Sequence, residues 1–313
     1  MPVNSEACGV SSGEDRGATD AGGKRLATGV PGLDALLGGG LLPGTLTVVV
    51  GATGIGKTQL GIQFAQAGGE HEGRRGVVFD MTARGDSQSH SDYARRMFGW
   101  RMSPVDIQSK PALERFFATD FQDGDYLHVF DYRGQRVTRR DLEWEQWQEW
   151  QSQLNTRLGT AIAFLYGNFV RGARRVVVDG IEPSDRPGES IQYNLFEYVY
   201  HQILRKDPEW VARDLFRERY LANAAAAAAH AYDPARIGCL LLCTSHESML
   251  EDLVSRRLDE GDALSNANTL IFMGKVRDGQ EMGRALYVAK HRGSECVDRI
   301  VPYRITAAGM AML

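Results

Sequence analysis

The sequence predicts an α/β fold, in which helices flank a mostly parallel central sheet that has an antiparallel edge at its C-terminal end. Short apolar, β-branched runs of the kind found in buried parallel strands alternate with helical patterns along most of the 313 residues. The last two apolar runs, at 269–273 and 285–290, instead flank the turn-forming residues 277–280, which predicts a hairpin.

The earlier strands are expected at 46–50, 76–81, 126–130, 175–179 and 238–244. Helices are expected at 57–66 and 141–165, and a helical insertion at 191–230 ends in the alanine run 224–229. No internal repeat divides the chain, so residues 25–313 are predicted to form one domain with helical insertions near 141–165 and 191–230. Residues 1–24 have too little apolar surface to order, which predicts a disordered leader.

Composition narrows the class of protein. The chain has 36 basic and 40 acidic residues, a net charge of -4, which disfavours a protein that coats nucleic acid through phosphate contacts. No run of roughly 18 apolar residues suits a membrane helix, and the N-terminus lacks the apolar stretch of a signal peptide. The four cysteines have no zinc-ligand spacing, and those at 239 and 243 bracket an apolar run typical of buried thiols. We therefore expect a cytoplasmic protein with no membrane contact.

A phosphate-binding motif follows the first predicted strand. The pattern G-x-x-x-x-G-K-[ST] is matched without a gap by Gly51, Ala52, Thr53, Gly54, Ile55, Gly56, Lys57 and Thr58. Strand, motif and helix come in the order that a P-loop requires. The glycines let backbone N–H groups turn toward phosphate oxygens, and the next helix aims its positive end at the same anion. Lys57 is expected to reach the β- and γ-phosphates, and the Thr58 hydroxyl to bind magnesium.

A P-loop of this kind needs an acidic partner for magnesium at the end of a neighbouring strand. Asp179 follows the apolar run 176–178 and is the predicted partner. Glu182 and Asp185 come next in the same loop and are further candidate acids.

Several segments together resemble a known superfamily. Thr28-Gly-Val-Pro-Gly-Leu-Asp34, then three glycines at 38–40, then Gly44-Thr-Leu-Thr-Val-Val-Val50 and the P-loop, resemble the opening of RecA, RadA and KaiC proteins. The C-terminal segments Val288-Ala-Lys-His-Arg-Gly-Ser294 and Tyr303-Arg-Ile-Thr306 make the KaiC-like ATPases the most similar group. The resemblance covers about residues 26–100 and 170–313, and implies a RecA-like fold that binds ATP and Mg²⁺.

The same resemblance implies self-association. In KaiC-like proteins a Lys-x-Arg-Gly-Ser element reaches into the nucleotide site of the neighbouring subunit, which here would involve Lys290, Arg292 and Ser294. On one strand the two cations would share a face and clamp a γ-phosphate, although charge that protects an edge strand is the alternative. Sharing the site in this way implies a hexameric ring or a filament.

One departure concerns catalysis. KaiC-like proteins usually carry two glutamates after the second strand, and one of them polarises the attacking water. Thr82 and Ala83 stand at those positions, with Asp80 and Asp86 as the nearest carboxylates. General-base activation is worth roughly 10²–10⁴ in rate, so we expect ATP binding with slow hydrolysis.

The candidate catalytic residues are Lys57, Asp80, Glu182, Lys290 and Arg292. The strand at 238–244 ends at a position where RecA-like folds place a polar sensor, and either Ser245 or His246 suits it.

We therefore expect a KaiC-like ATP-binding protein whose nucleotide state controls assembly and the binding of an unidentified protein partner. A DNA-dependent recombinase or helicase-type ATPase, and a pseudo-ATPase that binds nucleotide as a structural ligand, are the alternatives. Trp144, Trp147 and Trp150 form an aromatic helical face, suited either to core packing or to that partner.

Overall fold

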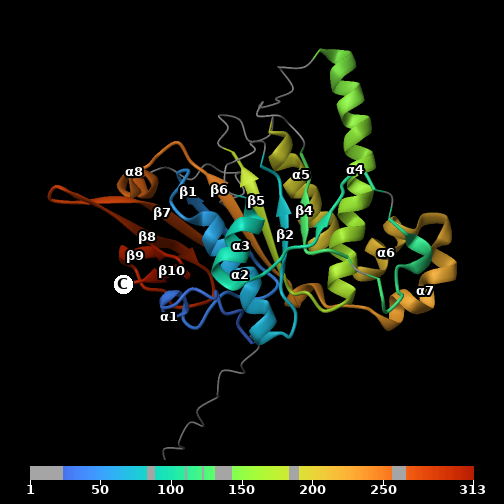
Figure 1. Ribbon diagram of the computed structural model, residues 1–313, viewed down its shortest axis with the longest axis horizontal. Helices are drawn as coiled ribbons and strands as arrows, with labels where there is room; N and C mark the ends of the chain where they lie inside the picture. The colour runs from blue at the N-terminus through green and yellow to red at the C-terminus, as the bar shows by residue number, and fades with distance from the viewer. Residues whose placement is uncertain are drawn as a thin grey trace, which may run out of the picture.

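The computed structural model describes residues 24–82, 89–109, 111–121, 123–130, 143–182, 190–255 and 266–313, so most of the predicted leader lies outside it. The described strands form one ten-stranded sheet in the order β10-β9-β8-β7-β1-β6-β5-β2-β4-β3 (Figure 1). Their bounds are β1 (Leu46–Gly51), β2 (Val77–Asp80), β3 (Pro104–Val105), β4 (Tyr126–His128), β5 (Arg175–Ile181), β6 (Gly238–Thr244), β7 (Thr269–Asp278), β8 (Glu281–His291), β9 (Val301–Thr306) and β10 (Gly309–Met312).

The predicted fold class is confirmed. Every pairing from β7 across to β3 is parallel, and β8, β9 and β10 add an antiparallel edge. The predicted hairpin is longer than expected, because β7 runs to Asp278 and β8 starts at Glu281. β3, β9 and β10 were not predicted. β3 has only two residues, and β9 alternates buried and exposed residues only at Val301–Arg304, which is too short a pattern to stand out.

α2 and α4 lie where helices were expected, with shifted ends, whereas α3 and α8 were not predicted. They are α1 (Leu33–Leu36), α2 (Lys57–His71), α3 (His90–Phe98), α4 (Trp144–Val170), α5 (Ile191–Val199), α6 (Pro208–Phe216), α7 (Tyr220–Ala229) and α8 (Leu250–Ser255). Residues 191–230 contain α5, α6 and α7. Figure 1 shows one end of α4 projecting beyond the sheet.

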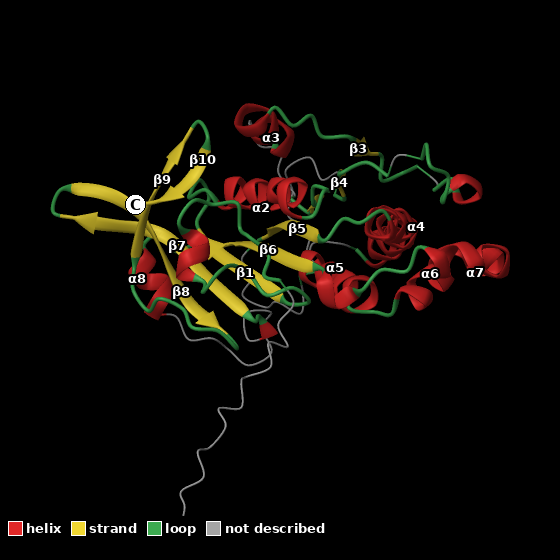
Figure 2. Ribbon diagram, turned by 90° about the horizontal axis from the view of Figure 1, so that it is seen from below, coloured by secondary structure: helices red, strands yellow, loops and turns green. Residues whose placement is uncertain are grey.

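Two hydrophobic cores lie on the two faces of the sheet. Alternate residues of each central strand enter different cores, because successive side chains of a strand point to opposite faces. In β5, Val176 and Val178 join the core that contains α4 and α5, whereas Val177 joins the core that contains α2. The parallel strands are therefore buried on both sides, with α2 and α3 over one face and α4 to α6 over the other (Figure 2).

One buried ion pair ties the amino end of β5 to α2. Arg175 is fully buried and donates to Glu72 from Nε (2.5 Å) and Nη2 (2.7 Å). Its Nη1 donates to the carbonyls of Ala27 (2.5 Å) and Phe64 (2.9 Å). This network joins the N-terminal segment, α2 and the sheet.

Other expectations can be compared with the described residues. The side chain of Trp144 is 65% exposed, so it does not pack in the core, while those of Trp147 and Trp150 lie outside the described part. Cys239 and Cys243 are buried free thiols, as predicted. Within the described ranges, no helix combines the length and the apolar character needed to cross a membrane.

The sheet order decides where the site lies. β1, β6, β5 and β2 are consecutive neighbours and run parallel, so their carboxyl ends meet at one edge. In open α/β sheets this edge is where ligands bind.

Candidate nucleotide site

The P-loop joins the end of β1 to the start of α2. Gly54 (φ 78°) and Gly56 (φ 111°) adopt the left-handed conformation that glycine tolerates best. A Cβ on Gly56 would lie 2.8 Å from Cδ1 of Ile305, so that side chain would have to move. The hydroxyl of Tyr303 in β9 donates to the carbonyl of Ile55 (2.7 Å). The antiparallel strand β9 therefore contacts the P-loop directly and helps to hold its shape.

Lys57 lies folded within this loop. Its side chain is buried, and Nζ donates to the carbonyls of Gly51 (2.7 Å) and Ala52 (2.9 Å). Burial lowers the pKa of Lys57, and the negative charge of Asp179 opposes that shift. The ammonium group is thus held by the carbonyls of the loop itself.

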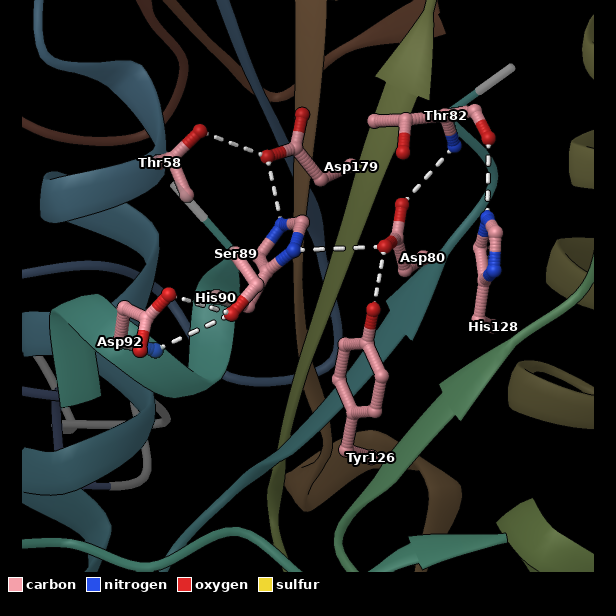
Figure 3. Close-up of polar contacts among 9 residues, drawn as sticks. All are labelled: Thr58, Asp80, Thr82, Ser89, His90, Asp92, Tyr126, His128 and Asp179. Carbon is pink, nitrogen blue, oxygen red and sulfur yellow. Dashed lines mark hydrogen bonds and ion pairs between the residues drawn. The ribbon is translucent and has the colours of Figure 1, made fainter. Parts of the chain in front are cut away.

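Thr58, the next residue, contacts the predicted magnesium partner. Its Oγ1 donates to Oδ2 of Asp179 (2.9 Å), so the first turn of α2 meets the carboxyl end of β5 (Figure 3). Hydroxyl and carboxylate oxygens are ligands that Mg²⁺ accepts, usually together with waters and substrate phosphates. The donor set therefore fits a Mg²⁺–nucleotide complex.

A histidine that the sequence reasoning missed lies against the same carboxylate. Nε2 of His90 is 2.9 Å from Oδ2 of Asp179, and Nδ1 is 3.3 Å from Oδ2 of Asp80 (Figure 3). Burial lowers the pKa of His90, but hydrogen bonds to the two carboxylates outweigh burial and raise it to about 10. The imidazole therefore joins the ends of β5 and β2.

Both carboxylate oxygens of Asp80 accept hydrogen bonds. The Tyr126 hydroxyl donates to its Oδ2 (2.6 Å), and the backbone N–H of Thr82 donates to its Oδ1 (2.8 Å). Burial raises the pKa of Asp80, but the hydrogen bond and charge of His90, with the hydrogen bond from Tyr126, bring it well below its usual value. A carboxylate with these contacts is poorly suited to take a proton from water, which argues against Asp80 as the base.

Of the remaining predicted acids, the structure describes only Glu182. Glu182 follows β5, and its backbone N–H donates to Oε1 of Gln192 (3.2 Å). Asp86 and Asp185 lie outside the described residues, as does Ala83. Thr82 lies just past the end of β2, which is the strand end expected for the missing glutamates.

The two sensor alternatives differ in their surroundings. Ser245 is buried, and its backbone N–H donates to the carbonyl of Gly51 (3.0 Å), whereas His246 is exposed. The Ser245 hydroxyl donates to the carboxylate of Glu247, a second residue that the sequence reasoning missed. Ser245 is therefore the one that adjoins the P-loop.

The Lys-x-Arg-Gly-Ser element lies elsewhere. Lys290 pairs with Leu270 near the start of β7, whereas Gly51 at the P-loop pairs with Met273, three residues further along. The element is therefore displaced toward the amino ends of β1 and β7, away from the chain's own P-loop. Arg292 lies one residue past the end of β8, so the expectation that both cations share a strand is wrong for Arg292.

Ser294 follows the turn at Arg292 and Gly293, directly after β8. Its Oγ accepts from Nη2 of Arg25 (2.5 Å), which also donates from Nη1 to the carbonyl of Gly40 (3.1 Å). The preceding His291 is buried and contacts Thr269 Oγ1 (2.8 Å) and the Leu37 carbonyl (3.1 Å). These contacts fix the turn against the N-terminal segment.

Part of the missed network had a local signal. Ser89 accepts from the backbone N–H of Asp92 at the start of α3, and Ser-x-x-Asp before a helix is a recognised start pattern. That pattern predicts where α3 begins. It does not predict that the first side chain of α3 reaches Asp179.

Comparison with known proteins agrees with this geometry. Residues 26–195, more than half of the chain, match the family described as "ATPase: KaiC". The circadian clock protein KaiC2 of Synechocystis sp. is 28% identical over 160 residues, which are 50% of this chain and 23% of that protein. The circadian clock oscillator protein KaiC of Rippkaea orientalis is 30% identical over 90 residues, 29% of this chain and 16% of that protein. The chain thus matches less than a quarter of the length of either relative.

A solved structure shows the shared fold. A KaiC-like protein from the hyperthermophilic archaeon Pyrococcus horikoshii superposes with a TM-score of 0.51 and 17% identity. The match covers 92% of this chain and 98% of that one. The mostly parallel sheet with antiparallel C-terminal strands is therefore a KaiC-like, RecA-type fold.

Proposed function

Because the chain belongs to the KaiC family of ATPases, we propose that it binds ATP with Mg²⁺ at residues 51–58 and hydrolyses it slowly. The hydrogen bond of 2.9 Å between Thr58 and Asp179 carries the proposal, since it joins the two groups that would hold the metal at the mouth of a P-loop. The bound Mg²⁺ would supply charge neutralisation of the phosphates. Lys57 would leave the loop carbonyls to contact the β- and γ-phosphates.

Slow turnover follows from the groups at the end of β2. Thr82 cannot act as a base, and Asp80 already accepts hydrogen bonds from Tyr126 and Thr82. Binding needs neither residue, because the P-loop backbone, Lys57 and Thr58 supply the phosphate and metal contacts.

A titration with a fluorescent ATP analogue tests binding. Lys57→Ala removes a buried ammonium group, and truncation of one member of a buried charge pair costs about 2–5 kcal/mol, or roughly 30-fold or more in affinity. Lys24→Ala is the control, because Lys24 is exposed in the N-terminal segment, close to Leu26, which pairs with Leu41 ahead of β1. Equal affinity of wild type and Lys57→Ala would show that the P-loop does not hold the nucleotide.

We further propose that the chain assembles head-to-tail, with Lys290 and Arg292 completing the site of a neighbour. The support is the resemblance of residues 288–294 to the KaiC element that reaches a neighbour's site, together with the displacement of Lys290 from the chain's own P-loop. Such a heterologous contact repeats as a closed hexameric ring or an open filament. ATP bound between subunits would favour the assembled form by mass action.

Light scattering with and without ATP and Mg²⁺ tests this assembly. We expect ATP to increase the mass of the wild type, and Arg292→Ala to reduce that response while the monomer stays folded. Arg284→Ala is the control, because it removes an exposed arginine from the same strand region. An assembly that ignores both ATP and Arg292 would refute the shared site.

The proposed regulatory role depends on that assembly. Because hydrolysis is slow, the chain would stay in one oligomeric form while ATP is bound, and that form would present the surface that binds the partner. A pseudo-ATPase is the second candidate, favoured by the occupied Asp80 and by Thr82 in a glutamate position. A single-turnover experiment with radiolabelled ATP separates the two. Release of phosphate that depends on Lys57 identifies an ATPase, and its absence identifies a protein that uses nucleotide as a ligand.

A further inference from the structure

We propose that His90 is a positioning residue of the nucleotide site, which holds the carboxylate of Asp179 in the orientation that Mg²⁺ requires. This inference rests on the proposed function, because it assigns a role toward the metal of the same site. It concerns a side chain of α3, outside both the P-loop and the strand that carries Asp179.

The geometry is that of a bridge between two strand ends. Figure 3 shows the imidazole between Asp179 at the end of β5 and Asp80 at the end of β2, with Thr58 on the far side of Asp179. Nε2 is 2.9 Å from Asp179 and Nδ1 is 3.3 Å from Asp80. Only 7% of His90 is exposed, so water competes little for either contact.

The contacts restrict how the Asp179 carboxylate can turn. Among the described residues, Thr58 and His90 both contact Oδ2 of the Asp179 carboxylate. Two donors on one oxygen fix the plane of the carboxylate and direct Oδ1 away from both. The carboxylate is therefore held in one orientation, in which it would help to hold the metal.

The imidazole is itself held in place. Asp80 fixes Nδ1 from one side, and the Tyr126 hydroxyl and the Thr82 N–H in turn fix Asp80. The chain from Tyr126 through Asp80 and His90 to Asp179 thus links β4, β2, α3 and β5. Outer groups that orient a metal ligand in this way typically change metal affinity by roughly 10–100-fold when they are removed.

The test measures the affinity of a fluorescent ATP analogue as a function of Mg²⁺ concentration, with an EDTA arm that reports metal-free binding. His90→Ala should raise the Mg²⁺ concentration for half-maximal effect by roughly 10–100-fold. Binding in EDTA should be unchanged, because the P-loop contacts remain.

Two conservative variants separate positioning from general damage. A glutamine places its amide nitrogen near the position of Nε2, and an asparagine near that of Nδ1. We therefore expect His90→Gln to restore most of the Mg²⁺ response and His90→Asn to behave like His90→Ala. His128→Ala is the control, because His128 lies beside the cluster and contacts the carbonyl of Thr82 (3.0 Å).

The outcomes are distinct. A wild-type Mg²⁺ response in His90→Ala, or equal responses of the glutamine and asparagine variants, would overturn the proposal. A tighter Mg²⁺ response in His90→Ala would also overturn it, by showing that His90 competes with the metal. Failure of the wild type to bind nucleotide through Lys57 would instead refute the proposed function, and this inference with it.

Discussion

Gly180 tests whether the close contact between β5 and the residues that follow β2 is needed for the candidate site. It lies in β5 directly after Asp179, has a φ of 107°, and coincides with a register shift against β6 between Asp179 and Ile181. A Cβ added there would lie 2.3 Å from the backbone nitrogen of Thr82 and 2.5 Å from the carbonyl carbon of Met81. Both contacts are with backbone, so Gly180→Ala cannot be relieved by turning a flexible side chain.

The expected loss of stability has two parts. An alanine at this positive φ costs about 1–3 kcal/mol. The forced shift of residues 81–82 adds about 1–3 kcal/mol or more, as overpacking does elsewhere. The free energy of unfolding should therefore fall by about 2–6 kcal/mol. Because Asp179 and Asp80 lie on the strand ends that must move, the affinity for ATP with Mg²⁺ should fall as well.

Gly172 is the matched control. Its φ is 93°, but an added Cβ would meet no atom within 4 Å, so Gly172→Ala carries the backbone cost alone. Guanidinium unfolding should show a larger loss for Gly180→Ala than for Gly172→Ala, and the nucleotide titration should detect only the former. Equal losses of stability, or unchanged nucleotide affinity in Gly180→Ala, would refute this account of the edge.

Three further outcomes follow from single contacts. Glu72→Ala leaves the guanidinium of Arg175 buried without its carboxylate, so the free energy of unfolding should fall by about 3–5 kcal/mol. Glu70 is exposed on α2, so Glu70→Ala should change the free energy of unfolding little. Tyr303→Phe removes the hydroxyl that contacts the P-loop, so the free energy of unfolding in denaturant should fall by about 1–3 kcal/mol and ATP should bind more weakly. Unchanged ATP affinity would mean that the P-loop keeps its shape without this hydrogen bond. Thr82→Glu restores a carboxylate at the end of β2 and should raise the single-turnover rate by up to roughly 10²–10⁴-fold, so an unchanged rate would show that a base acts from elsewhere.

Local patterns determined much of the fold. The P-loop, the five earlier strands and Asp179 were predicted because each depends on a short run of neighbouring residues. Apolar runs of this kind must be buried on both faces, which requires a parallel sheet with helices on each side. The strands β3, β9 and β10 near the two edges of the sheet were missed, since short strands that are only partly buried leave little trace in the sequence.

The tertiary structure decided the rest of the site. His90 and Asp179 are 89 residues apart, and they meet because the sheet order places β5 beside β2 and α3 above them. No pattern within either segment encodes that distance. The same applies to Asp80, which the sequence presented as a candidate base and the structure shows as an acceptor held by Tyr126, Thr82 and His90.

The sequence by itself therefore predicted which groups the chain offers: a P-loop motif, a hydroxyl and a carboxylate suited to a metal, and a cationic segment at the C-terminal end. Only the tertiary structure decided which of these groups meet. Strand register separates Lys290 from the chain's own P-loop and brings Thr58, Asp179 and His90 together. The reason is physical: burial and periodicity act between neighbouring residues, whereas side-chain contacts across a sheet depend on the order in which distant strands pair.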